Sequence, residues 1–236
     1  MNHSSFIDLK IASTVLYPRP FNIVCTSDGF VGKEWLMRHL GCIPTQKFVS
    51  DLGLVRDMLY AVMGLYSAVL IYSEASCSFD GTATPLPESI GKCVKMLGVP
   101  LVMIRTYGAF ARDPLYNGLQ LRKVDVSADL EYLLSPQEIA KASTAEINTL
   151  LAERFSFDNF RDQQEQQIRI TEPFRADGLN RVLYECPHGG NEGAMTGKGT
   201  TLTCNSCGKT YLLTETGFLE AQEDETECSH IPDWYR

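Results

Sequence analysis

The sequence predicts an α/β fold, in which a mixed, largely parallel sheet flanked by helices is followed by a small metal-binding β unit. Strand-length runs that are apolar on both faces alternate with helical patterns along residues 1–134, which is typical of a sheet covered by helices. Four cysteines and two histidines then gather between residues 186 and 230. Clustered thiols in a chain without an expected secretion signal favour a metal over disulfides.

The elements of the first part follow one another from residue 21 onward. Strands are expected at residues 21–26, 68–72 and 101–104, and helices at residues 33–40, 51–65 and 88–97. Asp51 is expected to cap its helix, and Gly41 to end the helix before it. Residues 1–134 are therefore assigned to one domain.

Three further segments complete the chain: a helical connection at 135–181, a metal-binding unit at 182–218 and an acidic return segment at 219–236. Ser135, Pro136 and Glu138 form the start of a helix whose apolar positions continue to about Phe155. The unit at 182–218 is expected to be too small to bury much core, so a metal would have to hold it together.

Composition limits the classes of function. The chain has 236 residues, 44% of them hydrophobic, and a net charge of −8. This balance excludes a wholly disordered chain and disfavours a nucleic-acid partner, which normally meets a basic surface. No signal peptide is expected from the first residues, and the most apolar run, residues 58–72, is shorter than the ~18 apolar residues of a spanning helix.

The first candidate site is a histidine and an aspartate five positions apart, His3 and Asp8. A histidine can take a proton from a hydroxyl near neutral pH, and a carboxylate on its other ring nitrogen would fix its tautomer. The alternative is a mobile, polar terminus without a function.

Four blocks of sequence make residues 2–110 resemble the glycerolipid acyltransferase family that includes the 1-acylglycerol-3-phosphate acyltransferases. Residues 2–8 (NHSSFID) match the family's N-H-x-S-x-x-D block, and residues 41–47 (GCIPTQK) lie where its second block belongs. Residues 72–78 (YSEASCS) correspond to its third block, usually F-P-E-G-T-R-S. Residues 99–104 (VPLVMI) resemble its fourth.

The resemblance implies that a fatty acyl group moves from a thioester donor, acyl-CoA or acyl-carrier protein, to a lysophospholipid or glycerol-3-phosphate-type hydroxyl. His3 would be the general base and Asp8 would orient it. The hydroxyl would attack the thioester directly, without an acyl-enzyme. Such an enzyme of phospholipid biosynthesis works at the cytoplasmic face of a membrane, here by peripheral association.

The sequence departs from the family where the acceptor's phosphate would bind. Cys77 stands in the place of the third-block arginine, and Lys47 stands near the place of the second-block arginine. Glu74, Ser76, Lys47 and Arg105 are assigned to the acceptor site, with Arg112 as a further local cation. Because a cysteine cannot replace the bidentate fork of an arginine, the acceptor is expected to be unusual or to lack a phosphate.

The second candidate site is a C-x-x-C-G turn at residues 204–208, whose two thiolates can reach one zinc ion. Cys186 and His188 precede it at the spacing of a zinc ribbon, so the predicted ligands are Cys186, His188, Cys204 and Cys207. Cys228 and His230 are rival ligands if the chain folds back. Four ligands leave no open position, so the zinc is expected to be structural.

Two other functions remain open on the sequence. A catalytically degenerate acyltransferase that holds a lipid or a partner would explain Cys77 and Ala75. A zinc-ribbon nucleic-acid protein is disfavoured by the acidic balance.

Overall fold

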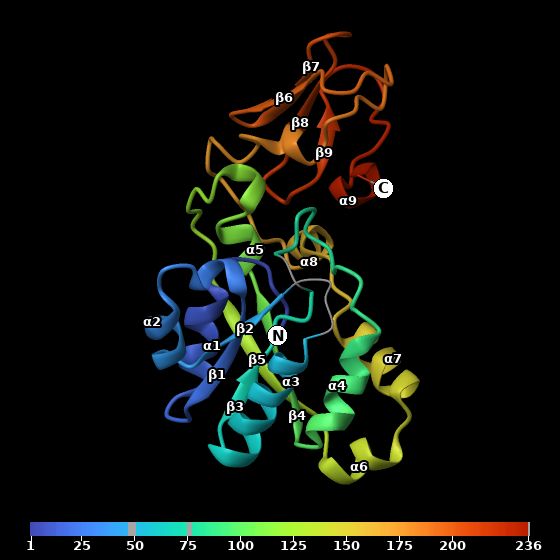
Figure 1. The fold of residues 1–236 in the computed structure, drawn as a ribbon. Helices are drawn as coiled ribbons and strands as arrows, with labels where there is room; N and C mark the ends of the chain where they lie inside the picture. Colours follow the sequence, from blue (N-terminus) through green and yellow to red (C-terminus); the bar gives the residue numbers. More distant parts are fainter. Residues whose placement is uncertain (47–50, 75–76, 236) are drawn as a thin grey trace.

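The computed structural model describes residues 1–46, 51–74 and 77–235. Figure 1 shows an α/β part, built mainly from the first 155 residues, and a separate β unit with strands β6 to β9 above it. The short helices α5 (Ala109–Arg112), α8 (Asn159–Glu165) and α9 (Ile231–Tyr235) lie between the two.

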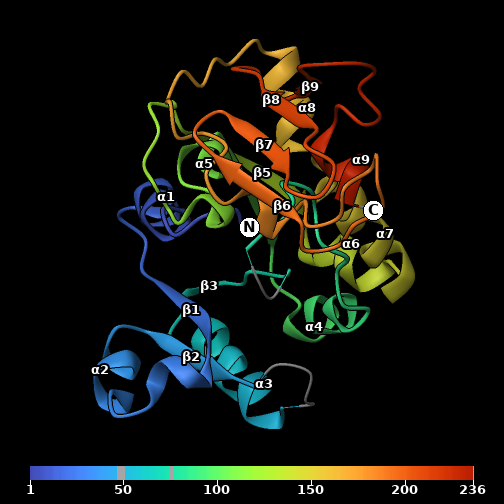
Figure 2. The same ribbon diagram turned by 90° about the horizontal axis from the view of Figure 1, so that it is seen from above.

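A three-stranded parallel sheet with the order β2-β1-β3 confirms the α/β class. Its strands are β1 (Phe21–Thr26), β2 (Cys42–Thr45) and β3 (Ala68–Leu70), and β3 is shorter than predicted. The crossovers contain the 3₁₀ turn η1 (Ser27–Phe30), α2 (Glu34–His39) and α3 (Leu52–Leu59), and they form one side of the molecule in Figure 2.

Both predicted helix boundaries near this sheet are confirmed. Gly41 follows α2 with a φ of +80°, a conformation that costs glycine little. The Asp51 side chain accepts a hydrogen bond of 3.1 Å from the Leu54 N–H at the start of α3. A π-helical turn, η2 (Tyr60–Gly64), follows α3 and leads toward β3. The helix predicted over residues 51–65 is therefore an α-helix continued by a π-helical turn.

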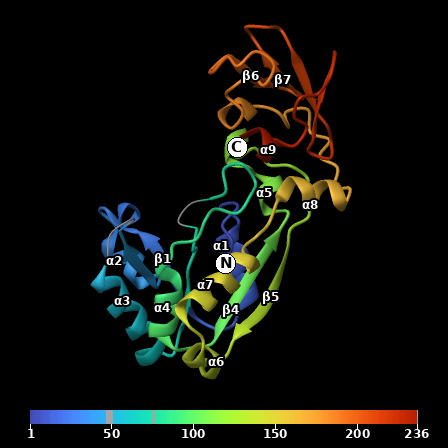
Figure 3. The same ribbon diagram turned by 90° about the vertical axis from the view of Figure 1, so that its right-hand side faces the viewer.

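The strand predicted at residues 101–104 belongs to a different sheet from the one expected. It is β4 (Leu101–Tyr107), and within the described chain it pairs only with β5 (Ser127–Leu134), antiparallel. The sequence did not predict β5, and Figure 3 shows the pair as a long ribbon. The amino-terminal segment runs between β3 and β4, because the amine of Met1 donates to the Ile71 carbonyl while Asn2 bonds the backbone of Thr106.

Three helices cover one face of the β4–β5 ribbon: α4 (Ser89–Leu97), α6 (Pro136–Lys141) and α7 (Thr144–Arg154). The single helix predicted from Ser135 to about Phe155 is two helices. Each has its own capping box, Ser135 with Glu138 and Ser143 with Glu146, and the second box starts a new helix. Buried apolar residues join them to the ribbon, namely Met103, Ile139, Ile147, Leu151 and Phe155.

The carboxyl-terminal unit is an antiparallel sheet with the order β6-β7-β8-β9. Its strands are β6 (Met195–Lys198), β7 (Thr201–Cys204), β8 (Thr210–Leu213) and β9 (Leu219–Ala221). The 3₁₀ turns η3 (Leu115–Asn117) and η4 (Leu179–Arg181) lie at its base, and η4 contacts β6.

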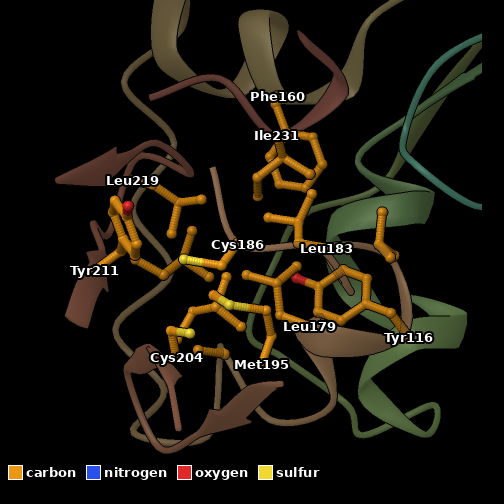
Figure 4. Close-up of a cluster of buried hydrophobic side chains, with 14 of the residues drawn as sticks. Tyr116, Phe160, Leu179, Leu183, Cys186, Met195, Cys204, Tyr211, Leu219 and Ile231 are labelled. Carbon is orange, nitrogen blue, oxygen red and sulfur yellow. The ribbon is translucent and has the colours of Figure 1, made fainter. Parts of the chain in front are cut away.

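The expectation that this unit buries little core is wrong. It shares a large cluster of buried side chains with the α/β part, to which Phe110, Tyr116 and Phe160 contribute. Figure 4 shows Tyr116 and Phe160 packed toward Leu179, Leu183 and Ile231. The unit therefore has apolar packing besides any metal.

The helix α1 (Asp8–Leu16) follows the amino-terminal segment. Among the residues that the structure describes, no helix combines the length and the apolar character that a membrane crossing requires.

Candidate active site and thiolate cluster

The amino-terminal segment that carries His3 is buried inside the α/β part. Asn2 is 2% exposed, and its side chain accepts a hydrogen bond of 2.9 Å from the Thr106 N–H and donates one of 3.3 Å to the Thr106 carbonyl. Met1 packs with Ala12, Ile23 and other apolar side chains. The alternative of a mobile terminus is therefore wrong, because Asn2 is hydrogen-bonded to β4 and Met1 is packed in the core, directly before His3.

The Asp8 carboxylate contacts three residues of the segment before α1. Its Oδ2 accepts the backbone N–H groups of Ser4 and Ser5 at 2.7 and 2.9 Å and lies 3.0 Å from His3 Nδ1. Asp8 is fully buried at the start of α1, where the helix dipole favours a negative charge. Because the carboxylate only accepts hydrogen bonds, His3 Nδ1 carries a proton, and Nε2 is the ring atom left to exchange one.

Glu74 holds the backbone of His3. One carboxylate oxygen accepts the His3 N–H at 2.8 Å and the other accepts the Thr84 N–H at 3.0 Å. Glu74 is buried, and burial raises its pKa despite these two hydrogen bonds. Both oxygens are engaged with the backbone, so Glu74 positions His3.

The Nε2 edge of the His3 ring meets a thiol. Nε2 lies 3.2 Å from Cys77 Sγ, and the ring stacks on Tyr72 with 4.2 Å between centroids. The His3 side chain is 21% exposed. Burial disfavours the imidazolium, but the hydrogen bonds to Asp8 and Cys77 outweigh it and raise the pKa of His3 to about 9.

Further polar contacts fix the segments around this pair. The Ser78 N–H donates to the His3 carbonyl at 2.8 Å, and the Ser78 hydroxyl donates to the Thr82 carbonyl at 2.7 Å. The Ser5 hydroxyl donates to Asp113, which follows α5. The sequence analysis missed Tyr72, Thr106 and Asp113 as site residues because their signal is long-range contact, which no local pattern carries.

The assigned acceptor-site residues are not all brought together. Lys47 and Ser76 lie outside the described residues. Thr106 points toward Asn2, so its neighbour Arg105 points to the opposite face of β4, where its guanidinium lies 3.5 Å from the Ser156 carbonyl. Arg105 therefore lies away from His3.

Arg112 is the further local cation. It precedes Asp113, the residue that holds Ser5. Its Nε is buried and, within the described chain, lacks a hydrogen-bond partner. Two surface hollows lie elsewhere, one beside Tyr116 and Arg181 and one between β5 and helices α6 and α7, and neither includes His3.

Three of the predicted metal ligands come together. The Sγ atoms of Cys186, Cys204 and Cys207 all lie within 4.8 Å of one another, and those of Cys186 and Cys207 are 3.7 Å apart. Thiolates in a tetrahedral zinc site, with bonds of about 2.3 Å, lie about 3.8 Å apart. The donor set fits zinc, and Figure 4 shows Cys186 and Cys204 next to Met195 and Tyr211 in the core.

Backbone groups support a thiolate at Cys204. Burial opposes its ionisation, but the N–H groups of Cys207 and Ser206 outweigh burial and lower the pKa of Cys204. At Cys186 burial prevails and raises the pKa. A bound metal ion would supply a positive charge beside Cys186 and so stabilise its thiolate.

The structure does not bring the proposed fourth ligand to the three thiols. The Nδ1 of His188 lies 3.0 Å from Glu227 Oε1, and the His188 side chain is mostly exposed. The rival ligands are also engaged elsewhere, because Cys228 bonds the His230 carbonyl, while His230 lies between Asp158 and Asp233.

Comparisons with known proteins give one solved structure. No family model matches the sequence, and no curated protein matches it. The crystal structure of the 1-acyl-sn-glycerophosphate (LPA) acyltransferase PlsC from Thermotoga maritima is similar, with a TM-score of 0.47 and 17% identity. The alignment covers 72% of this chain and 66% of that chain, so this chain spans slightly less than two thirds of that enzyme's length.

Proposed function

We propose that the chain is an O-acyltransferase that moves a fatty acyl group from acyl-CoA or acyl-carrier protein to a hydroxyl of a lysophospholipid or glycerol-3-phosphate-type acceptor. The observation that carries this proposal is the His3–Asp8 pair, in which Nδ1 lies 3.0 Å from Oδ2. The pair lies on a buried segment that Met1 and Asn2 hold in place. Rigid placement of a base is what general-base catalysis requires.

His3 Nε2 takes the proton of the attacking hydroxyl in this mechanism. Asp8 fixes the tautomer through Nδ1 and stabilises the imidazolium that forms. Glu74 and Ser78 act indirectly, since both bond the His3 backbone. With its raised pKa, His3 is mostly protonated at neutral pH, so turnover rises with pH toward about 9.

The acceptor's head group is proposed to meet Arg112, which precedes the Ser5 partner Asp113 and whose Nε is buried without a hydrogen-bond partner in the described chain. Lys47 belongs to the second block of the resemblance and remains proposed for the same role, with Ser76 beside the acceptor. Arg105 is not proposed, because β4 directs it to the other face.

Peripheral association with the cytoplasmic face of a membrane is proposed through α2. Trp35, Leu36 and the following Leu40 are 71%, 48% and 65% exposed, and Lys33 and Arg38 lie in the same segment. Exposed Trp and Leu beside basic residues suit an anionic lipid surface. Flotation with anionic vesicles tests this, and the variant Trp35→Ala is expected to float less.

A structural zinc ion held by Cys186, Cys204 and Cys207 is proposed for the β unit. When bound, the metal neutralises the thiolates and ties residue 186 to the β7–β8 turn. His188 is the proposed fourth ligand, since it is two residues from Cys186 and would exchange Glu227 for the metal. Metal analysis is expected to find one zinc per chain.

The second candidate is a catalytically degenerate module that binds a lipid or a partner. It is favoured by Cys77, which stands where the family has arginine and occupies the Nε2 of His3.

An acyl-transfer assay separates the two candidates. Labelled acyl-CoA and acyl-carrier protein are offered with a panel of detergent-dispersed phosphorylated and neutral lysolipids. Turnover that is lost in His3→Ala but kept in His39→Ala, an exposed histidine of α2, supports the enzyme. A folded, zinc-loaded chain without turnover supports the binding module.

A further inference from the structure

We propose that Cys77 is a catalytic nucleophile, which accepts the acyl group from the thioester donor and passes it to the acceptor hydroxyl. This inference rests on the proposed acyltransferase function and replaces its single direct transfer by two successive transfers. The direct attack implied by the sequence resemblance needs no protein nucleophile. In this chain a thiol lies on the ring atom that the incoming hydroxyl would use.

The geometry is that of a nucleophile, a base and a group that orients the base. Cys77 Sγ lies 3.2 Å from His3 Nε2, and His3 Nδ1 lies 3.0 Å from Asp8 Oδ2. Each distance is within hydrogen-bond reach, which this type of catalysis requires. His3 and Asp8 belong to one amino-terminal segment, and Cys77 is 74 positions from His3, so folding brings the thiol to the pair.

The position of Cys77 is set on its carboxyl-terminal side. Ser78 is fully buried, donates its N–H to the His3 carbonyl and donates its hydroxyl to the Thr82 carbonyl. Cys77 itself remains partly exposed. Cys77 is therefore held next to the base and stays partly exposed.

The surroundings of Cys77 differ from those of a packing thiol. Cys93 illustrates the other case, because it packs among apolar side chains and burial raises its pKa. Cys77 faces an imidazole that is backed by a carboxylate. Such a partner can take the thiol proton while the sulfur attacks a substrate.

The first half-reaction moves the acyl group from one sulfur to another. His3 Nε2 takes the thiol proton, and Cys77 Sγ attacks the carbonyl carbon of the donor thioester. The bond between that carbon and the donor sulfur breaks, and the donor leaves as a thiol after taking the proton from His3. The products are acyl-Cys77 and the free donor thiol.

The second half-reaction releases the acyl group to oxygen. His3 Nε2 takes the proton of the acceptor hydroxyl, whose oxygen attacks the acyl carbonyl of acyl-Cys77. The bond to Cys77 Sγ breaks, and the thiolate regains the proton from His3. The enzyme returns to its starting state, and no oxidant, reductant or further reactant is needed.

The test detects acyl-Cys77 without an acceptor. The full chain is mixed with labelled acyl-CoA, quenched in acid, and analysed by intact mass and peptide mapping. We expect one acyl group per chain on Cys77, released by hydroxylamine and discharged by lysolipid at a rate no slower than turnover. Cys77→Ala is expected to form no adduct and to lose at least 100-fold in turnover, and His3→Ala to acylate at least 10-fold more slowly.

The matched control is Cys93→Ala, which removes a thiol far from the histidine and is expected to acylate normally. Thermal unfolding of each variant reports whether it has folded. In Cys77→Ser the sulfur is replaced by oxygen, so any adduct is expected to resist hydroxylamine under conditions that release the thioester.

The outcomes separate this inference from the proposed function. Turnover that depends on His3, with no adduct and with Cys77→Ala within twofold of the unaltered chain, overturns the nucleophile and leaves the acyltransferase standing. An adduct that no lysolipid discharges supports the nucleophile and overturns the acceptor class. A folded chain with neither adduct nor turnover overturns both.

Discussion

Two regions of this molecule place cysteines next to groups that can react with or bind a thiol, and the side chains around the cysteines differ between the two regions. Cys77 lies beside the imidazole of His3, partly exposed, on a loop fixed by polar contacts. Cys186 and Cys204 lie in an apolar core and, together with Cys207, face other sulfurs. A base next to a thiol suits proton transfer, whereas three thiols around one point suit a metal. The side chains that surround each thiol therefore decide whether it suits proton transfer or metal binding.

The two regions also differ in how they are assembled. Among the three clustered thiols, Cys204 ends β7, Cys207 lies in the turn to β8, and Cys186 precedes β6, 21 positions before Cys207. The His3 site joins segments that are 71 to 108 residues apart. The experiments below challenge this contrast, from the largest expected effect to the smallest.

The variant Asp8→Asn is expected to cause the largest loss. The amide removes the negative charge that orients and stabilises His3, so turnover should fall by about 10³-fold or more. The zinc content should remain unchanged, because the thiol cluster lies in the other part of the chain. A variant that folds and loses less than tenfold would show that His3 does not depend on Asp8.

Removal of a metal ligand should lower stability. Cys204→Ser or chelation of the metal is expected to reduce the free energy of unfolding by on the order of 3 kcal/mol. The β unit should loosen without complete unfolding, because Leu202, Tyr211 and Leu219 stay in the shared core. Thermal unfolding with and without chelator measures this, and equal melting temperatures would argue against a structural metal.

Alkylation should distinguish the two kinds of thiol directly. With metal bound, iodoacetamide at pH 7 is expected to modify Cys77 about tenfold faster than Cys186, Cys204 or Cys207, because metal-held thiolates are shielded. The variant His3→Ala should abolish this preference. Peptide mapping of briefly treated protein gives the relative rates.

The titration of His3 should respond to its thiol neighbour. The pKa of His3 is expected near 9, and lower in Cys77→Ala, because Cys77 contributes to raising it. The raised value also links to stability, since protonation of His3 stabilises the fold fully below pH 6.5, and this stabilisation is lost as the pH rises through about 9. Histidine NMR titration measures the pKa, and an unchanged value in Cys77→Ala would contradict the contact.

The smallest effect is expected at Arg105. Its guanidinium faces away from His3, so Arg105→Ala should change the acceptor's KM by less than about twofold, within the range of a remote surface change. Arg112→Ala should raise that KM substantially more. A reversal of this order would place the acceptor on the other face of β4.

Sequence patterns predicted the local features well. The strand at Phe21–Thr26, the Asp51 cap, the Gly41 terminus and the capping box at Ser135 all depend on neighbours within a few residues. The C-x-x-C-G turn belongs to the same class, since it is set by its own spacing. Such signals remain readable without knowledge of the tertiary structure.

Long-range contacts could not be predicted in the same way. The pairing of β4 with β5, the insertion of residues 1–3 between β3 and β4, and the core shared with Phe110 and Phe160 all join distant segments. The sequence shows Cys77 in place of an arginine, but its contact with His3 follows only from the fold. Arg105 was assigned by proximity in sequence, and the alternation of side chains along β4 moved it to the opposite face.

The separation between Ser5 and Asp113 has a consequence for synthesis on the ribosome. These residues are 108 positions apart and their side chains are hydrogen-bonded in the fold. At about 5–20 residues per second, the nascent chain carries its histidine for about 5–20 s before Asp113 is even made. Throughout that interval the hydrogen bond that ties the amino-terminal segment to the end of α5 cannot form. The segment that carries His3 can therefore reach its full set of native contacts only after most of the α/β part has been synthesised.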